Sequence, residues 1–324
     1  MRKAIVLFAF FIFGFAVFAE SANTENCKGL DKKRFRIDQE NRVEIKEPVN
    51  VYINVSSLID TVEITPAKDN VMSVKVDSRL HLQTNINNFT VDVKMKDNDI
   101  TVETNEYPKE LRMLYCDKRG KSVIYITLPL KNINLVVFKG AMTQIKCKGI
   151  KSKIFKVKSK FKDAILTDCV FKELSVKTYE GDVVLKNVKA EKFNVYGGFG
   201  NVNLTATEFG KTFVSLLSGD IESFGEVSMD NALISTTFGD IVLDLKNFKS
   251  FDFKTDSGDV ILGLKNPSEI YFDGKTEFGD FYLKFKGKEN LKPENGKLVF
   301  GDKTKPQIKI QTRSGDIELR KTGK

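Results

Sequence analysis

Acidic side chains recur at a nearly fixed interval through the second half of the chain. They are Asp163, Asp182, Asp220, Asp240, Asp259, Asp280 and Asp316, with Asn201 in the equivalent place in one copy. Carboxylates stacked in a column repel one another, and calcium is the cation that such oxygen ligands attract. The known calcium-binding roll, however, uses nonapeptide repeats with paired glycines, which are absent here, and no second acidic column completes the coordination. We therefore interpret each Asp as a hydrogen-bond acceptor for a backbone N–H of its own turn, and expect no metal or other cofactor.

A dense run of lysines is the second chemical feature, because no acidic residue lies between Lys139 and Asp163. Alternation with Ile145, Ile154 and Val157 places most of these lysines on one outward face, where they would attract a polyanion. The alternative is a solvated face that discourages edge-to-edge pairing of strands, and both interpretations remain open. The candidate polyanion-binding residues are Lys146, Lys148, Lys151, Lys153, Lys156, Lys158 and Lys160.

Bulky and smaller residues alternate in a third column, one position before each glycine or its equivalent. The members are Phe161, Glu180, Phe199, Ser218, Phe238, Ser257, Phe278 and Ser314. If the column faces outward, the rings would form a stacking groove for sugars or peptides. If it faces inward, the alternation matches side-chain volumes at a tight corner. We favour inward packing.

Catalytic chemistry has weak support in this sequence. His81, the single histidine, lies between Leu80 and Leu82, and no serine or cysteine is placed to act with it, so we interpret it as an ordinary strand residue. A β-helix polysaccharide lyase would need clustered acids beside Arg or Lys in a cleft built by long loops. Short repeats leave little loop for such a cleft, and the chain contains no Trp for sugar stacking. We expect a protein that is not an enzyme.

These side chains are positioned by an internal repeat of a glycine, then Asp or Asn, then alternating apolar residues. The first six glycines lie 19 to 21 residues apart and the seventh follows after 36; they are Gly181, Gly200, Gly219, Gly239, Gly258, Gly279 and Gly315. Apolar residues stand two and four positions after the glycine, as in Val183 and Leu185, and again twelve and fourteen positions after it. Two short strands per repeat predict an all-β fold, a parallel β-solenoid in which Val202 stacks on Val183. The glycine suits a turn that needs a positive φ.

The Ser-Gly-Asp-Ile phrase at this interval follows a Tyr-Ile-Thr-Leu-Pro segment at Tyr125–Pro129. In these motifs the chain resembles the bacterial "putative adhesin" family known as DUF4097, and the related head domain of "putative autotransporter adhesins". The resemblance spans roughly residues 123–319, and more weakly the strands before them. It implies a parallel β-solenoid on the envelope or surface of a bacterium and supplies no catalytic residue.

The chain divides into three parts in sequence order. Residues 1–19 carry Arg2 and Lys3 before an unbroken apolar stretch that ends in Val-Phe-Ala, which predicts a secretory signal peptide cleaved after Ala19. The alternative, an uncleaved anchor, is disfavoured because the stretch is shorter than the roughly 20 residues that span a bilayer. Residues 20–120 alternate without the glycine phrase and form an irregular β region, either a separate small sandwich or the first coils of the solenoid. Residues 121–324 form the solenoid repeats, with an inserted loop at about 286–306.

The net charge and the cysteines limit which partners and which cellular compartment fit this chain. The formal charge of +9 falls to +7 without Arg2 and Lys3, which favours acidic partners such as an anionic glycan or another envelope component. Because export is expected, nucleic acid is not an expected partner, and the protein should not be integral to the membrane once its signal is removed. The four cysteines, Cys27, Cys116, Cys147 and Cys169, permit two disulfides in three pairings or buried free thiols. Cys147 and Cys169 should lie near each other, since they are little more than one coil apart.

The functional expectation is an exported, non-catalytic protein of the periplasm, cell surface or extracellular space. It would act as an adhesin-like scaffold that binds a partner through a repetitive solenoid face. A periplasmic regulatory or stress-sensing module is the first alternative, and a carbohydrate-active enzyme is the second.

Overall fold

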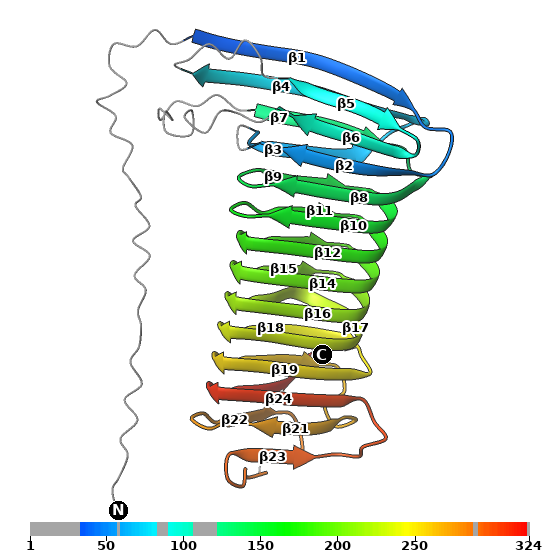
Figure 1. The fold of residues 1–324 in the computed structure, drawn as a ribbon. Helices are drawn as coiled ribbons and strands as arrows, with labels where there is room; N and C mark the ends of the chain where they lie inside the picture. Colours follow the sequence, from blue (N-terminus) through cyan, green and yellow to red (C-terminus); the bar gives the residue numbers. More distant parts are fainter. Residues whose placement is uncertain (1–32, 57–58, 83–89, 106–121, 288–290, 323–324) are drawn as a thin grey trace, which may run out of the picture.

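The computed structural model describes residues 33–56, 59–82, 90–105, 122–287 and 291–322. Their strands join in one hydrogen-bonded network that winds into a column of stacked coils (Figure 1). The predicted all-β solenoid is therefore confirmed. Among these residues, no helix has the length and apolar character needed to cross a membrane. The expected signal peptide at residues 1–19 and the segment 106–121 lie outside the described residues.

Two rows of parallel strands form the regular body of the column, and each coil contributes one strand to each row. The long row contains β8 (Ile133–Gly140), β10 (Lys151–Ser159), β12 (Val170–Glu180), β14 (Lys189–Phe199), β16 (Glu208–Ser218), the C-terminal half of β17 (Ile221–Phe238) and β19 (Ser250–Ser257). The short row contains β9 (Gln144–Lys148), β11 (Ala164–Thr167), β13 (Val183–Lys186), β15 (Val202–Thr205), the N-terminal part of β17, β18 (Ile241–Asn247) and β20 (Val260–Leu264).

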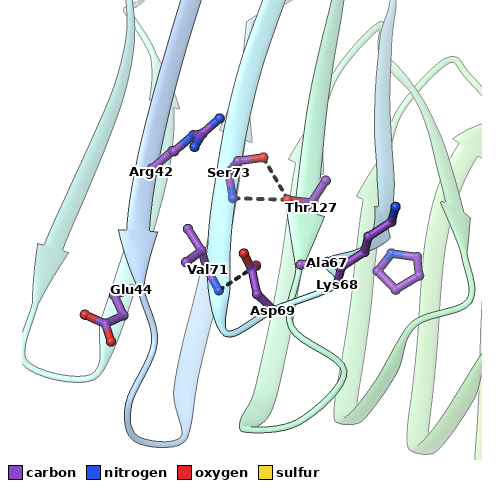
Figure 2. A pocket seen from close by; sticks show the side chains of 9 residues that line it. Arg42, Glu44, Ala67, Lys68, Asp69, Val71, Ser73 and Thr127 are labelled. Carbon is purple, nitrogen blue, oxygen red and sulfur yellow. Dashed lines mark hydrogen bonds between the residues drawn. The ribbon is translucent and has the colours of Figure 1, made fainter.

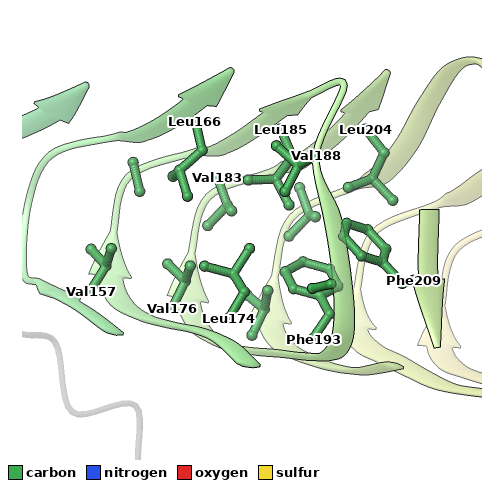
Figure 3. Close-up of a cluster of buried hydrophobic side chains, with 14 of the residues drawn as sticks. Val157, Leu166, Leu174, Val176, Val183, Leu185, Val188, Phe193, Leu204 and Phe209 are labelled. Atoms are coloured by element: carbon green, nitrogen blue, oxygen red, sulfur yellow. The ribbon is translucent and has the colours of Figure 1, made fainter. Parts of the chain in front are cut away.

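The apolar alternation inside each repeat builds the core between the two rows. Val202 pairs with Val183 and Leu204 with Leu185, which confirms the predicted register. Side chains of the long row, such as Phe193, pack against those of the short row, and all of these residues are buried (Figure 3). A single repeat cannot cover its own apolar face, so each coil gains stability only through its neighbours.

Glycine is required at the corner where the long row turns into the short row, because successive backbones approach closely there. A Cβ on Gly239 would lie 2.2 Å from the carbonyl oxygen of Gly219, and the φ of Gly239 is +148°. Five of the predicted turn glycines share this positive φ: Gly181, Gly200, Gly219, Gly239 and Gly258. Gly279 and Gly315 lack it, but a Cβ on either would lie 2.0 Å from a neighbouring carbonyl oxygen. The close approach is thus the requirement that all seven share.

The N-terminal β region continues the same column. Strand β2 (Val49–Val55) lies parallel between β6 (Asp99–Thr104) and β8, and β3 (Thr61–Pro66) lies parallel between β7 (Ser122–Leu128) and β9. These strands therefore add irregular coils to the column before the regular repeats. Antiparallel strands cover this end: β1 (Lys33–Glu44) pairs with β4 (Val71–Leu82), β4 with β7, and β5 (Val91–Lys96) with β6.

At the C-terminal end the coils do not stack in sequence order. Strand β24 (Gln307–Ser314) lies between β19 and β21 (Tyr271–Lys275), and β25 (Ile317–Lys321) lies between β20 and β22 (Phe281–Lys284) (Figure 1). The expected insertion at about 286–306 contains β23 (Lys297–Phe300), which pairs antiparallel with β21. The last coil of the chain is therefore inserted between the coil of β19 and β20 and the coil of β21 and β22.

Candidate anion-binding groove

Three lysines from successive coils form a ladder on the outer face of the long row. Lys158 of β10 pairs with Lys139 of β8 on one side and with Lys177 of β12 on the other. All three side chains are exposed, and none of them takes part in the ion pairs found among the described residues. Neighbouring strands are about 4.8 Å apart, so the ladder concentrates positive charge in a short distance.

This lysine ladder borders a groove of about 830 Å³, a volume in the range of small-molecule sites. The groove lies where the long row ends at the glycine corner, beside the ends of β2 and β6. Its lining residues are Asn54, Val55, Ser56, Thr104, Lys139, Gly140, Ala141, Lys158, Ser159, Lys160, Phe161, Lys177, Thr178 and Tyr179. Cationic, hydroxyl and aromatic groups therefore converge on one concave surface.

Two hydroxyl groups at the groove lack a protein hydrogen-bond partner. They are Ser56 Oγ and Thr178 Oγ1, both of which are buried. In later coils the equivalent threonine is satisfied, since Thr236 Oγ1 donates to the carbonyl oxygen of Gly219 and Thr255 Oγ1 to that of Gly239. Buried polar groups rarely remain unpaired, so these two hydroxyls are available to water or to a ligand.

The predicted lysine cluster is divided between the two rows. Lys151, Lys153, Lys156 and Lys158 belong to β10, whereas Lys146 and Lys148 belong to β9 in the short row. Lys146 is also held by Glu63, with 3.6 Å between Nζ and Oε1. Of the seven candidates, the structure places Lys158 and Lys160 in the groove.

Sequence reasoning missed Lys177 and left Lys139 out of the binding candidates. Both line the groove, and both stand 19 residues from Lys158, which is the repeat length. Following a single column from coil to coil, instead of a continuous run of lysines, would have found them.

The column before the glycine faces solvent, so the prediction of inward packing was wrong. The exposed fractions of Phe161, Phe199, Phe238 and Phe278 range from 41% to 73%. The corner is filled instead by small residues two positions earlier, such as Thr236 and Thr255. Their hydroxyls donate hydrogen bonds to backbone carbonyl oxygens of the preceding coil. Rings do not fit in this narrow space and turn outward.

The aspartate column also differs from expectation, because its hydrogen bonds connect coils and do not close individual turns. Asp240 Oδ1 accepts a hydrogen bond of 2.8 Å from the backbone N–H of Asp259, and Asp220 Oδ1 accepts one of 2.9 Å from that of Asp240. The same bond links every rung from Asp163 to Asp280. Across the ranges that the structure describes, no group of three or more His, Cys, Asp and Glu side chains is arranged to hold a metal ion.

A second concave surface lies at the N-terminal end, between β1, β4 and β7, with a volume of about 630 Å³ (Figure 2). Several of its polar groups already have protein partners. Arg42 Nε donates to Glu40 at 2.8 Å, which raises the pKa of the guanidinium, and Asp69 Oδ1 accepts from the N–H of Val71. Ser73 bonds Thr127 through both its backbone and its hydroxyl. We therefore regard the lysine groove as the stronger binding candidate.

Cys147 and Cys169 lie close together in the core, as expected from their spacing. Both are buried free thiols in this structure, with 3.8 Å between the sulfur atoms. Burial raises the pKa of Cys147 well above its usual value, whereas the hydrogen bond with Cys147 lowers that of Cys169. Cys27, Cys116 and the side chain of His81 lie outside the described part of the structure.

A column of stacked coils that carries a basic groove on its side defines a β-solenoid scaffold. The family model of Toastrack DUF4097 proteins matches residues 50–320, so the chain belongs to this family, which confirms the resemblance found in the sequence. No protein with curated annotation matches the chain.

Several solved structures match the chain at low sequence identity. A "putative adhesin" of Parabacteroides distasonis is 12% identical, with a TM-score of 0.53 and coverage of 89% of this chain and 98% of that one. A "putative adhesin" of Bacteroides fragilis is 17% identical, with a TM-score of 0.47 and coverage of 90% and 98%. A "putative lipid binding protein" of Parabacteroides distasonis is 14% identical, with a TM-score of 0.35 and coverage of 88% and 97%. At 12% identity the likeness to the first of these structures is one of fold alone.

Proposed function

We propose that this protein is an exported, non-catalytic, adhesin-like scaffold that binds an anionic partner of the cell envelope through the lysine groove. The observation that carries the proposal is the ladder of Lys139, Lys158 and Lys177, which borders a concave surface without carboxylate partners. Like charges in such proximity destabilise the isolated protein, and a bound anion relieves their repulsion.

The chemistry of the groove supports binding more than turnover. Its described lining residues supply cations, hydroxyls and rings, and they include neither a carboxylate nor an imidazole to transfer a proton. The two unpaired hydroxyls of Ser56 and Thr178 add hydrogen-bond donors for an anionic oxygen. The parallel coils hold these groups at fixed spacing, which lowers the entropic cost of binding.

The binding test uses polygalacturonate as a carboxylated polymer and polyphosphate as a phosphorylated one, titrated by calorimetry at several salt concentrations. The double variant Lys158→Ala/Lys177→Ala should lose about tenfold or more in affinity and show a weaker dependence on salt. The matched control, Lys246→Ala/Lys265→Ala, removes the same charge from exposed positions elsewhere and should change affinity by less than about threefold. Equal losses in both variants would show that net charge alone attracts the polymer, and the groove would have no specific role.

A further inference from the structure

Exposed apolar side chains follow the glycine corner over five successive coils. This apolar stripe consists of Phe161, Tyr179, Phe199, Leu217 and Phe238, whose exposed fractions lie between 41% and 55%. The ring centres of Phe161 and Tyr179 are 6.2 Å apart, and those of Tyr179 and Phe199 are 5.8 Å apart. With about 4.8 Å between coils, the stripe is roughly 19 Å long. An exposed apolar surface of this extent is typical of an interaction site.

The apolar stripe has a defined end. In the coil after Phe238 the same positions carry Asp256 and Ser257, and in the next coil of the stack they carry Arg313 and Ser314. The run is therefore interrupted after Phe238 and is not a property of every repeat. The same position carries Met142, 41% exposed, one coil before Phe161, and Phe278, 73% exposed, beyond the two polar coils.

Positive charge accompanies only one end of the stripe. Lys177 stands two residues before Tyr179 on the same strand, and the lysine ladder continues from there toward the N-terminal end of the column. In the opposite direction the same column continues as Tyr196, Ser215 and Ser235, which carry no charge, and its next lysine, Lys254, stands one coil beyond the stripe. One carboxylate, Glu180, also lies at this corner, where it is outnumbered by the four lysines of the groove. A cationic groove that adjoins the apolar stripe is complementary to an anionic amphiphile, because the groove matches the charged head and the stripe matches the apolar tail.

The arrangement of the rings favours an alkyl chain over a row of sugars. Phe161 and Tyr179 are nearly perpendicular, with 88° between their planes, and Tyr179 and Phe199 are at 83°. Such edge-to-face rings form a ridged apolar surface, and they do not present coplanar faces to successive sugar rings. Gly198 lets the next coil approach Tyr179, because a Cβ there would lie 2.5 Å from the carbonyl oxygen of Tyr179 and 3.2 Å from its ring.

We propose that the partner is a lipid with an anionic headgroup, which refines the proposed function and rests on it. The headgroup binds in the groove against Lys139, Lys158 and Lys177, with the hydroxyls of Ser56 and Thr178 as further donors. One acyl chain lies along the apolar stripe from Phe161 toward Phe238. The rigid coils hold both sites in line, so headgroup and chain bind as one unit.

The test uses Tyr179→Trp as a reporter, because the chain has no other tryptophan. Octyl phosphate and dodecyl phosphate, both below their micellar concentrations, are titrated while Trp emission is recorded. We expect a blue shift and a gain of about tenfold or more from octyl to dodecyl, since each partly buried methylene contributes roughly a factor of two. Inorganic phosphate and dodecyl glucoside, which keep only one half of the ligand each, should bind much more weakly.

Variants separate the stripe from the groove. Phe199→Ser/Leu217→Ser, in the reporter background, should abolish the gain from octyl to dodecyl phosphate and leave polygalacturonate binding to the lysines intact. Phe224→Ser is the matched control, because Phe224 is 59% exposed but belongs to the short-row part of β17. It should preserve the gain.

Other outcomes would overturn the lipid proposal in distinguishable ways. Polymer binding without any effect of alkyl length would leave the proposed function standing and make a polysaccharide the partner. Absence of binding by both probe classes would refute the proposed function as well. Concentration-dependent self-association in sedimentation, lost in Leu217→Ser, would show that a second copy of the chain covers the stripe.

Discussion

At the scale of single residues, the corner of each coil is defined by two columns that depend on each other. The glycine column lets successive backbones approach closely, and the aspartate column then bridges the same coils through hydrogen bonds of 2.7 to 3.0 Å to backbone N–H groups. A side chain larger than hydrogen in the first column would separate the bonded groups of the second. Asn201 occupies one rung of the ladder and accepts the N–H of Asp220 at 2.9 Å, so the role needs an oxygen acceptor and no charge.

Gly239→Val should destabilise the protein by roughly 3 kcal/mol or more, because it combines an unfavourable φ with a collision against the Gly219 carbonyl. Lys151→Ala, at an exposed position of β10, should change the free energy of unfolding by less than about 0.5 kcal/mol. Urea denaturation of both variants measures the difference. Similar losses in the two would contradict the coil register.

The acceptor role of the aspartate column predicts that two substitutions of Asp240 change the free energy of unfolding differently. Asp240→Ala leaves the N–H of Asp259 unpaired and should cost about 1–2 kcal/mol. Asp240→Asn keeps the acceptor and removes repulsion from the neighbouring carboxylates, so it should be neutral or slightly stabilising. Thermal unfolding at neutral pH compares them. If the Asn variant is as unstable as the Ala variant, the negative charge itself has a role that the hydrogen bonds do not explain.

At the scale of elements, both ends of the column place a chain-terminal coil inside the stack. The coil of β2 and β3 is covered by β6 and β7, and the coil of β24 and β25 is covered by β21 and β22. Antiparallel strands cover part of these ends, as β23 does on β21. An outermost parallel strand exposes a row of unpaired backbone groups to other chains, and β23 removes that edge from β21, whereas β22 pairs with β25 alone among the described strands.

A chain that ends after Pro306 tests this order. It lacks β24 and β25, so β21 and β22 lose the coil on which they stack, and residues 265–306 should become sensitive to limited proteolysis. The coils between residues 122 and 264 should stay protected. In a column stacked in sequence order, the same truncation would remove only the outermost coil, and residues 265–306 would remain protected too.

At the scale of the whole molecule, the charge is unevenly distributed along a rigid column. The formal charge of the chain is +9, and the lysine ladder concentrates part of it near the N-terminal end. This concentration of charge would steer the proposed anionic partner toward one region of the surface.

Accessibility of the protein on intact source cells tests its proposed location. If it is displayed on the surface, an added protease should digest it without permeabilisation of the cells. Digestion only after the outer membrane is permeabilised would instead favour a periplasmic scaffold or sensor. Resistance that persists even then, with a periplasmic marker digested in the same sample, would contradict export.

The repeat was predictable from the sequence alone, because every coil encodes its own strands, turn and buried positions within about 20 residues. The stacking of Val202 on Val183, the turn glycines and the proximity of Cys147 to Cys169 all follow from that period. Lys139 and Lys177 could have been found by the same spacing.

Only the tertiary structure decided the features that depend on neighbouring coils. The outward direction of Phe238 results from a corner already filled by Thr236, and the direction of the aspartate bonds results from the next coil of the stack. The position of β24 between β19 and β21 depends on which strand edges remain free after the other coils have stacked. The sequence period describes one coil stacked on coils of similar sequence. The features above arise where adjacent coils differ in sequence or where the column ends.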